Sequence, residues 1–174
     1  MFVKMTHKPI NSFFFVNLLL AAAGCLASCS ETSAIWDIAP ITPKIYLYDA
    51  DGSNLLDPAC AGGVDISGVT AAFKGETYYV TCGEDTKAYM PVFIGLVLKQ
   101  DFKGNYCLEF GELDGTEDFA NETLAVDWGD GMSTEITIFN RFRWKNNGSP
   151  SISRHFLLDG VRTKDEVPVF YVVK

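Results

Sequence analysis

Hydrophobic and polar residues alternate in short runs along most of this chain. The runs are rich in Val, Ile, Thr, Tyr and Phe and recur roughly every 10 to 15 residues, whereas no window keeps the 3.6-residue period of a helix. The pattern therefore predicts strands at Lys44–Tyr48, Asp65–Phe73, Glu76–Thr81, Pro91–Lys99, Gly104–Phe110, Thr123–Trp128, Thr134–Trp144, Ile152–Leu158 and Pro168–Val173.

Within the stretch 134–144, residues Ile136, Ile138, Phe142 and Trp144 form one apolar face that is interrupted only by Asn140. Such alternation indicates a sheet with one buried side. We expect an all-β, immunoglobulin-like β-sandwich of antiparallel strands, because the longer connections at 49–64, 82–90 and 111–122 suit strands that switch sheets. A lipocalin-like β-barrel is the alternative, since nine strands with hairpin signals could also close.

The turn Gly129-Asp130-Gly131 supplies the positive φ angles of a tight hairpin between two predicted strands. It makes Trp128 a core or rim aromatic. With Asp127, these residues resemble the Trp/Gly-Asp-Gly signature of PKD-type immunoglobulin-like domains. The resemblance implies the sandwich and no catalytic activity.

The N-terminus has a basic start with Lys4 and Lys8, followed by an apolar run of roughly a dozen residues, where a membrane-spanning helix needs about 20. These proportions predict a secretory signal peptide. The run ends in Leu26-Ala27-Ser28-Cys29, which resembles the lipobox of bacterial lipoproteins. The alternatives are an ordinary signal peptide and a second, less complete lipobox ending at Cys25.

The lipobox resemblance implies that residues 1–28 are removed, that Cys29 receives the lipid, and that acyl chains such as palmitate anchor the protein. It implies a bacterial envelope protein, with the outer membrane as the address because Ser30 is not aspartate. Residues 29–43 then form a tether and 44–174 a single domain. The segment around Asp51-Gly52 and Asn54 to Pro58 also resembles the opening of a group of uncharacterised Bacteroidetes lipoproteins.

The formal net charge is -8, and removing a leader that holds two lysines and no acids leaves the body at about -10. Such a body repels nucleic acid, because phosphate binding needs a positive surface. It also has no net attraction for an anionic bilayer. The link to the lipid bilayer is therefore expected to come from acylated Cys29.

Cys60, Cys82 and Cys107 remain in the body, and an oxidising compartment permits a disulfide. We expect Cys60–Cys82, with three unpaired thiols as the alternative. Zinc is not expected, because the cysteine spacing is wrong and His155 is the sole histidine of the body.

The acidic stretch after Tyr48 offers a calcium alternative, with candidate ligands Asp49, Asp51, Asn54 and Asp57. Its glycine does not fall at the EF-hand position. A plain turn that sends Leu55 and Leu56 into the core is therefore preferred, and neither a metal nor another cofactor is expected.

Catalytic motifs are missing from the sequence. His155 has no nucleophile motif near it, and Arg141 to Lys145 reads as a strand with Phe142 and Trp144 on one side and the arginines on the other. The expected function is a non-catalytic, lipid-anchored module that binds an unknown protein or glycan through the loops 114–121 and 82–89. The alternatives are a structural or accessory subunit of an envelope complex, and a hydrolase using two of the carboxylates of Glu109, Glu112, Asp114, Glu117 and Asp118.

Overall fold

The computed structural model describes residues 35–82 and 95–174, and its main compact unit is the body Trp36–Lys174. The predicted signal peptide, the lipobox and Cys29 lie outside the described residues, as does most of the loop 82–89. Within the described part, no helix is both long and apolar enough to span a bilayer.

The body is all-β, as the alternating pattern predicts, and each of the nine predicted strands has a counterpart. The predicted stretch 65–73 divides into a short 3-10 helix and a strand, and a two-residue strand near the C-terminus was not predicted. The elements are β1 (Lys44–Tyr48), η1 (Ile66–Gly68), β2 (Thr70–Phe73), β3 (Glu76–Cys82), β4 (Leu96–Gln100), β5 (Tyr106–Phe110), β6 (Phe119–Asp127), β7 (Ser133–Trp144), β8 (Pro150–Leu158), β9 (Val161–Arg162) and β10 (Val169–Val173).

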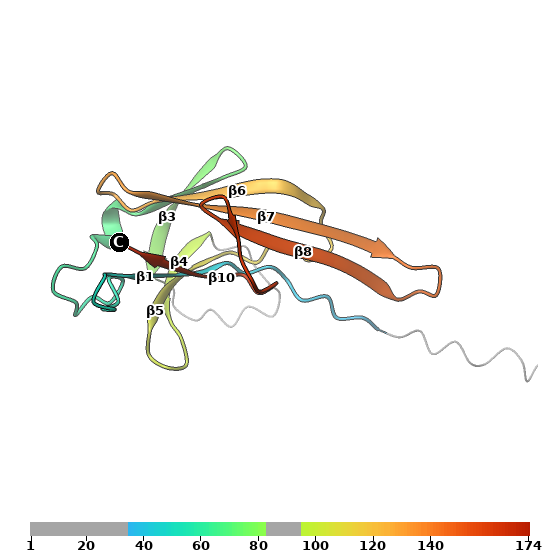
Figure 1. Cartoon of the computed structure of the whole chain (residues 1–174), viewed down its shortest axis with the longest axis horizontal. Helices are drawn as coiled ribbons and strands as arrows, with labels where there is room; N and C mark the ends of the chain where they lie inside the picture. The colour runs from blue at the N-terminus through green and yellow to red at the C-terminus, as the bar shows by residue number, and fades with distance from the viewer. Residues whose placement is uncertain (1–34, 83–94) are drawn as a thin grey trace, which may run out of the picture. The chain divides into compact units, whose positions relative to one another are not determined.

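All ten strands belong to one mixed sheet in the order β10-β1-β5-β4-β3-β2-β6-β7-β8-β9, which curls as a half-barrel (Figure 1). Strand β3 joins its two halves, because its residues 76–79 pair with β2 and its residues 80–82 pair with β4. The expectation of purely antiparallel strands is wrong at two places: β1 runs parallel to β10, and β3 runs parallel to β4. Both parallel pairs join segments that no tight hairpin connects.

The core lies between the two halves of the curled sheet. Phe156 of β8 meets Phe170 of β10 edge to face with ring centroids 5.8 Å apart, although these strands stand near opposite ends of the sheet order. Trp128 is 1% exposed and its Nε1 donates to Thr134 Oγ1 at 2.9 Å, which confirms it as a core residue. The predicted positive φ angles are present at Gly129 and Gly131.

The body begins earlier than predicted. Ile41 is fully buried and exchanges two 2.9 Å backbone hydrogen bonds with Leu113. The predicted boundary at Lys44 is therefore too late, and the last residues of the expected tether belong to the fold. The flanking residues Pro40 and Pro43 signal a break in regular structure, but they do not prevent the side chain between them from filling the core.

Candidate functional site

Asn140, the polar residue on the apolar face of β7, is 1% exposed and fully hydrogen-bonded. Its Nδ2 donates to the carbonyls of Gly115 at 3.0 Å and Glu117 at 2.7 Å, and its Oδ1 accepts from Arg154 Nε at 3.0 Å. A buried amide that is satisfied in this way specifies one arrangement of its partners. Asn140 therefore holds the loop before β6 in place against β7.

Arg154 of β8 extends this network to the N-terminal segment. Its Nη2 donates to the Ala39 carbonyl at 3.3 Å, and burial lowers the pKa of its guanidinium, which stays charged at neutral pH. Gly115 lies so close to the same segment that an added Cβ would be 2.3 Å from the Ala39 oxygen. The loop and the segment before β1 are therefore packed directly on each other.

Asp118 ends the ladder between β6 and β7. The final ladder pair is Phe119 with Asn140, and beyond it Asp118 Oδ1 accepts the backbone N–H of Phe142 at 2.9 Å. Its Oδ2 pairs with Arg143 Nη1 at 2.6 Å. The backbone hydrogen bond from Phe142, followed by the Arg143 pair, lowers the pKa of Asp118. Asp118 thus orients Arg143 as well as closing the ladder.

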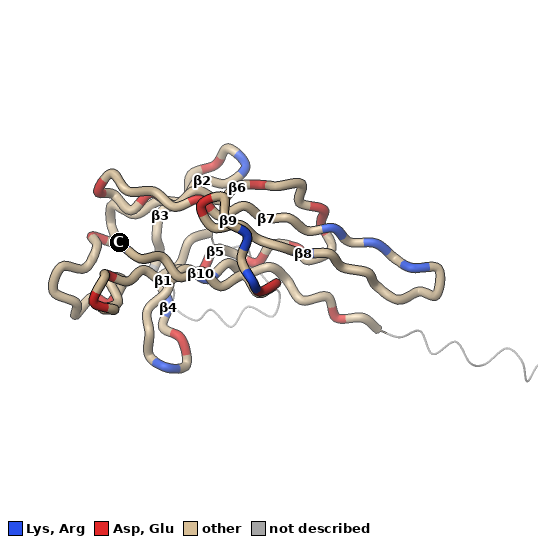
Figure 2. Tube along the Cα trace, in the orientation of Figure 1, with Lys and Arg blue, Asp and Glu red and all other residues tan. Residues whose placement is uncertain are grey.

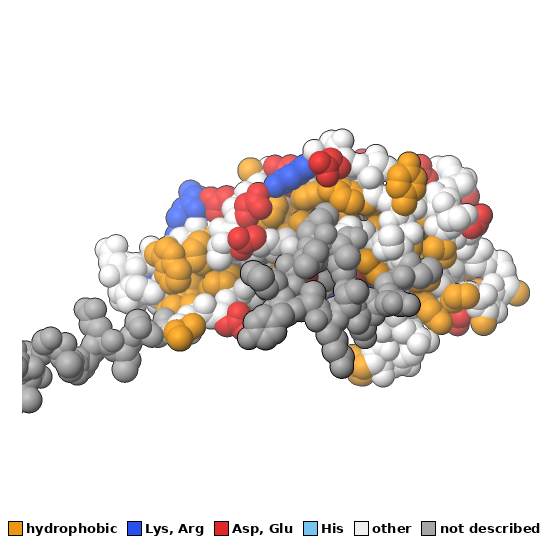
Figure 3. Space-filling view, turned by 180° about the vertical axis from the view of Figure 1, so that it is seen from behind, with side chains coloured by type: hydrophobic (Ala, Val, Ile, Leu, Met, Phe, Trp, Pro, Cys, Tyr) orange, Lys and Arg blue, Asp and Glu red, His pale blue; other side chains and the backbone are white. Residues whose placement is uncertain are grey.

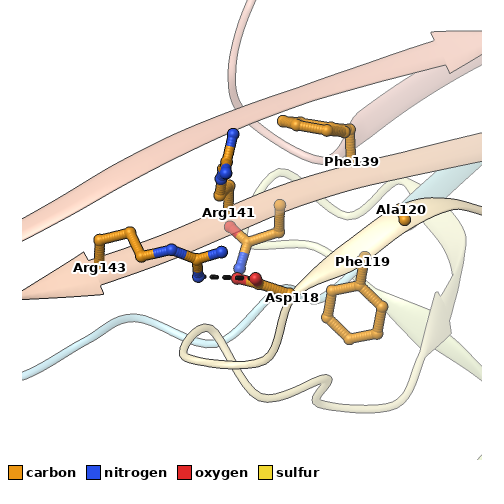
Figure 4. A pocket seen from close by; sticks show the side chains of 7 residues that line it. Asp118, Phe119, Ala120, Phe139, Arg141 and Arg143 are labelled. Atoms are coloured by element: carbon orange, nitrogen blue, oxygen red, sulfur yellow. Dashed lines mark hydrogen bonds and ion pairs between the residues drawn. The ribbon is translucent and has the colours of Figure 1, made fainter.

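A pocket of about 230 Å³ opens beside these residues on the outer face of β7 (Figure 4). It includes part of the loop 114–121 that the sequence analysis names as a binding loop. Its volume is below the roughly 300–1,000 Å³ of pockets for drug-sized ligands, so only a small group would fit. The lining residues are Asp118, Phe119, Ala120, Phe139, Asn140, Arg141 and Arg143.

Positive charge dominates this pocket. Among the described residues, no carboxylate lies within ion-pair distance of Arg141, whereas Arg143 is paired with Asp118. Phe139 stacks on His155 with ring centroids 4.4 Å apart. Desolvation, helped by the charge of Arg162, lowers the pKa of His155, so its ring is neutral at pH 7. The pocket therefore combines a guanidinium that is not in a direct ion pair with an aromatic wall.

The calcium candidates form ordinary turns. Asp49 Oδ1 accepts the backbone N–H groups of Asp51 and Ser53, Asn54 Oδ1 accepts that of Leu56, and Asp57 Oδ1 accepts that of Ala59. Leu55 and Leu56 are buried, at 7% and 1% exposed, which confirms the predicted turn that sends both into the core.

The predicted disulfide between Cys60 and Cys82 is not formed at Cys60, which is a free thiol. Cys60 packs against the core from the loop after β1, whereas Cys82 ends β3 and faces Leu98 of β4 in the ladder. The side chain of Cys82 lies outside the described part. Cys107 is also a free thiol and is 1% exposed.

Several candidate hydrolase carboxylates are bound to basic or polar partners. Glu109 lies between Lys44 and Lys99 with both distances at 2.7 Å, and Glu117 pairs with Lys74 at 2.7 Å. Asp114 accepts the backbone and hydroxyl donors of Thr116. Each of these three acids is therefore bound to its own partners on a different strand or turn.

The predicted alternation at the end of β7 is confirmed, because Phe142 and Trp144 contact each other edge to face at 5.1 Å, on the side away from the pocket arginines. The roles of Phe139 and Arg154 were not predicted from the sequence. The sequence did carry one signal for Phe139, because it is an aromatic residue on the otherwise polar face of β7.

Comparison with protein-family models, curated proteins and solved structures found no match for this chain, so the roles of these residues follow from their chemistry and geometry alone.

Proposed function

We propose that this protein is a lipid-anchored component of a bacterial cell envelope whose body binds, without catalysis, a small anionic group in the pocket of β7. The observation that carries the binding role is the position of Arg141, which lines the pocket and has no carboxylate within ion-pair distance among the described residues. A guanidinium forms two parallel hydrogen bonds with a carboxylate or a phosphate, so the pocket suits a ligand with one of these groups.

The neighbours of Arg141 narrow the ligand class. Phe139 offers an aromatic surface that is supported from beneath by His155, and an apolar face of a sugar ring can pack against such a surface. Arg143 is pre-oriented by Asp118 at the pocket wall. A glycan unit that bears a carboxylate or a phosphate therefore fits both the charge and the size of the pocket.

Titration of the full chain with glucuronate and with glucose 1-phosphate tests the binding role, with glucose as the matched neutral sugar. We expect the anionic sugars to bind and glucose to bind much more weakly. Arg141→Gln should reduce the affinity about tenfold, because one charged hydrogen-bonding partner is lost. Lys103→Gln removes one positive charge at the distant β4–β5 turn and should leave the affinity unchanged. Equal binding of glucose, or no effect of Arg141→Gln, would refute the assignment.

The anchor has its own test, because the lipobox resemblance supports it independently of the pocket. Expression in a bacterium that processes lipoproteins should yield a chain that begins at Cys29 and carries acyl groups by mass spectrometry. Cys29→Ala should abolish the acylation. A mature chain that starts elsewhere and carries no acyl group would remove the anchor from the proposal.

A further inference from the structure

The end of the β7–β8 hairpin carries an apolar face that the core does not cover. Trp144 is 58% exposed and Ile152 is 44% exposed. Phe142, which is only 9% exposed and contacts the Trp144 ring, lies opposite Ile152 in the ladder, so the three side chains share one face. Figure 3 shows hydrophobic side chains gathered at this end of the body. We call Phe142, Trp144 and Ile152 the hairpin patch.

Basic residues lie at the same end of the hairpin, with Arg141 and Arg143 on the face of β7 opposite the hairpin patch. Arg141, Arg143 and Lys145 occupy alternate positions along the end of β7 and into its turn, and Figure 2 shows basic positions in succession at this end of β7. Asp118 pairs with Arg143, whereas Arg141 and Lys145 have no carboxylate within ion-pair distance among the described residues. Although the net charge of the whole chain is -8, the fold therefore gathers positive charge at one end.

The N-terminal segment leads to this same end. The contacts of Ala39 with Arg154 and Gly115 hold it beside β8, and from there the described chain runs toward the side on which the β7–β8 turn lies (Figure 1). Six residues lie between Cys29 and Trp36, which makes seven steps from one Cα atom to the next. Fully extended, they span at most about 25 Å. A lipid on Cys29 would thus keep this part of the body close to the membrane surface.

We infer that the end of the β7–β8 hairpin, with the hairpin patch and the basic residues beside its turn, docks on the anionic surface of the bilayer that holds the lipid anchor. The inference rests on the lipid anchor of the proposed function. Trp is favoured at the membrane interface, and Lys and Arg near the surface are attracted by anionic headgroups. The exposed Trp144 beside Lys145 provides both features. Docking by this end would orient the body, with the acidic loop after β1 and the β6–β7 turn directed away from the lipids (Figure 1).

Quenching of tryptophan fluorescence by brominated lipids tests the docking. The lipidated full chain with Trp36→Phe is reconstituted in vesicles of phosphatidylethanolamine and phosphatidylglycerol that carry brominated acyl chains. Trp144 should be quenched. The same chain with the additional change Trp144→Phe retains the buried Trp128 and gives the baseline. Quenching no greater than this baseline would overturn the inference.

A second measurement tests how the docking depends on charge. Lys145→Gln should lower the ratio of docked to undocked chain about fivefold, since each basic residue near an anionic surface contributes about 1 kcal/mol. Lys103→Gln is the matched control and should have no effect. Replacing phosphatidylglycerol by a neutral lipid should lower the ratio further, and quenching that is insensitive to both changes would contradict docking on an anionic surface.

The two proposals fail in different ways. An acylated chain that floats with the vesicles but shows no Trp144 quenching keeps its anchor and loses the docking. A chain found without acyl groups loses the anchor, and its addition to the same vesicles then decides the docking directly from the Trp144 signal.

Discussion

Arg154 of β8 donates to the buried side chain of Asn140 on β7, with 3.0 Å between Nε and Oδ1. This bond is part of a network that connects the β7–β8 hairpin to two other segments. Asn140 also donates to two carbonyls of the loop before β6, and Arg154 donates to the carbonyl of Ala39. The position of the pocket and the path of the N-terminal segment therefore depend on the same two side chains.

Asn140→Leu should destabilise the body by about 2–3 kcal/mol, because the carbonyls of Gly115 and Glu117 and one N–H of Arg154 lose their partner in a buried place. Urea denaturation followed by circular dichroism measures this loss. Asn146→Leu, in the exposed β7–β8 turn, is the matched control and should change stability by less than about 0.5 kcal/mol. Similar effects of the two changes would contradict the role given to the Asn140 network.

Trp128→Phe should cost about 2–4 kcal/mol, because it leaves a cavity in the core and deprives the fully buried Thr134 hydroxyl of its indole partner. The matched control is Trp144→Phe, since Trp144 is 58% exposed. Thermal or chemical denaturation compares them. Equal destabilisation by the two substitutions would contradict the position of Trp128 in the core.

Glu109 should make the stability depend on pH. Burial acts to raise the pKa of Glu109, but hydrogen bonds from Lys44 and Lys99 outweigh it and leave the pKa lowered, while the bond to Glu109 raises the pKa of Lys44. A lowered acid pKa stabilises the fold above the ordinary value of about 4.3, and that contribution is lost as the pH falls through the native pKa. The raised pKa of Lys44 keeps the pair charged up to about pH 10.

Glu109→Gln should therefore reduce stability at neutral pH by about 1 kcal/mol, a modest value because solvent screens the half-exposed lysines. The difference from the unchanged chain should shrink below about pH 4. Denaturation curves at several pH values measure it, and Glu112→Gln, at an exposed position, serves as control. A difference that stays constant down to pH 2 would argue against the ion pairs.

The two described thiols should react at different rates. Cys60 is partly buried in a loop, whereas Cys107 is 1% exposed and burial raises its pKa, which disfavours the reactive thiolate. Iodoacetamide at pH 8 should label Cys60 in the folded protein and Cys107 only after unfolding, as peptide mass spectrometry can show. A Cys60 peptide found linked to the Cys82 peptide would instead restore the disulfide that the sequence suggested.

The strands, the tight turn at Gly129 and Gly131, the burial of Leu55, Leu56 and Trp128, and the two faces of β7 could all be predicted from the sequence. Each depends on local properties: the two-residue period of a strand, the φ angles that glycine permits, and the tendency of apolar side chains to leave water. The lipobox at Cys29 also rests on a short contiguous pattern, and it stays a prediction because it lies outside the described residues.

Only the tertiary structure decided which strands pair and what they bring together. The parallel pairing of β1 with β10, the burial of Ile41 against Leu113, and the contacts of Asn140 all join residues far apart in the chain. Such contacts depend on register and on the competition among many possible pairings, which local periodicity does not encode. The sequence shows Asn140 as a polar exception on an apolar face. Only the fold shows that the loop before β6 and Arg154 provide its hydrogen-bond partners, and that Arg154 in turn binds the N-terminal segment.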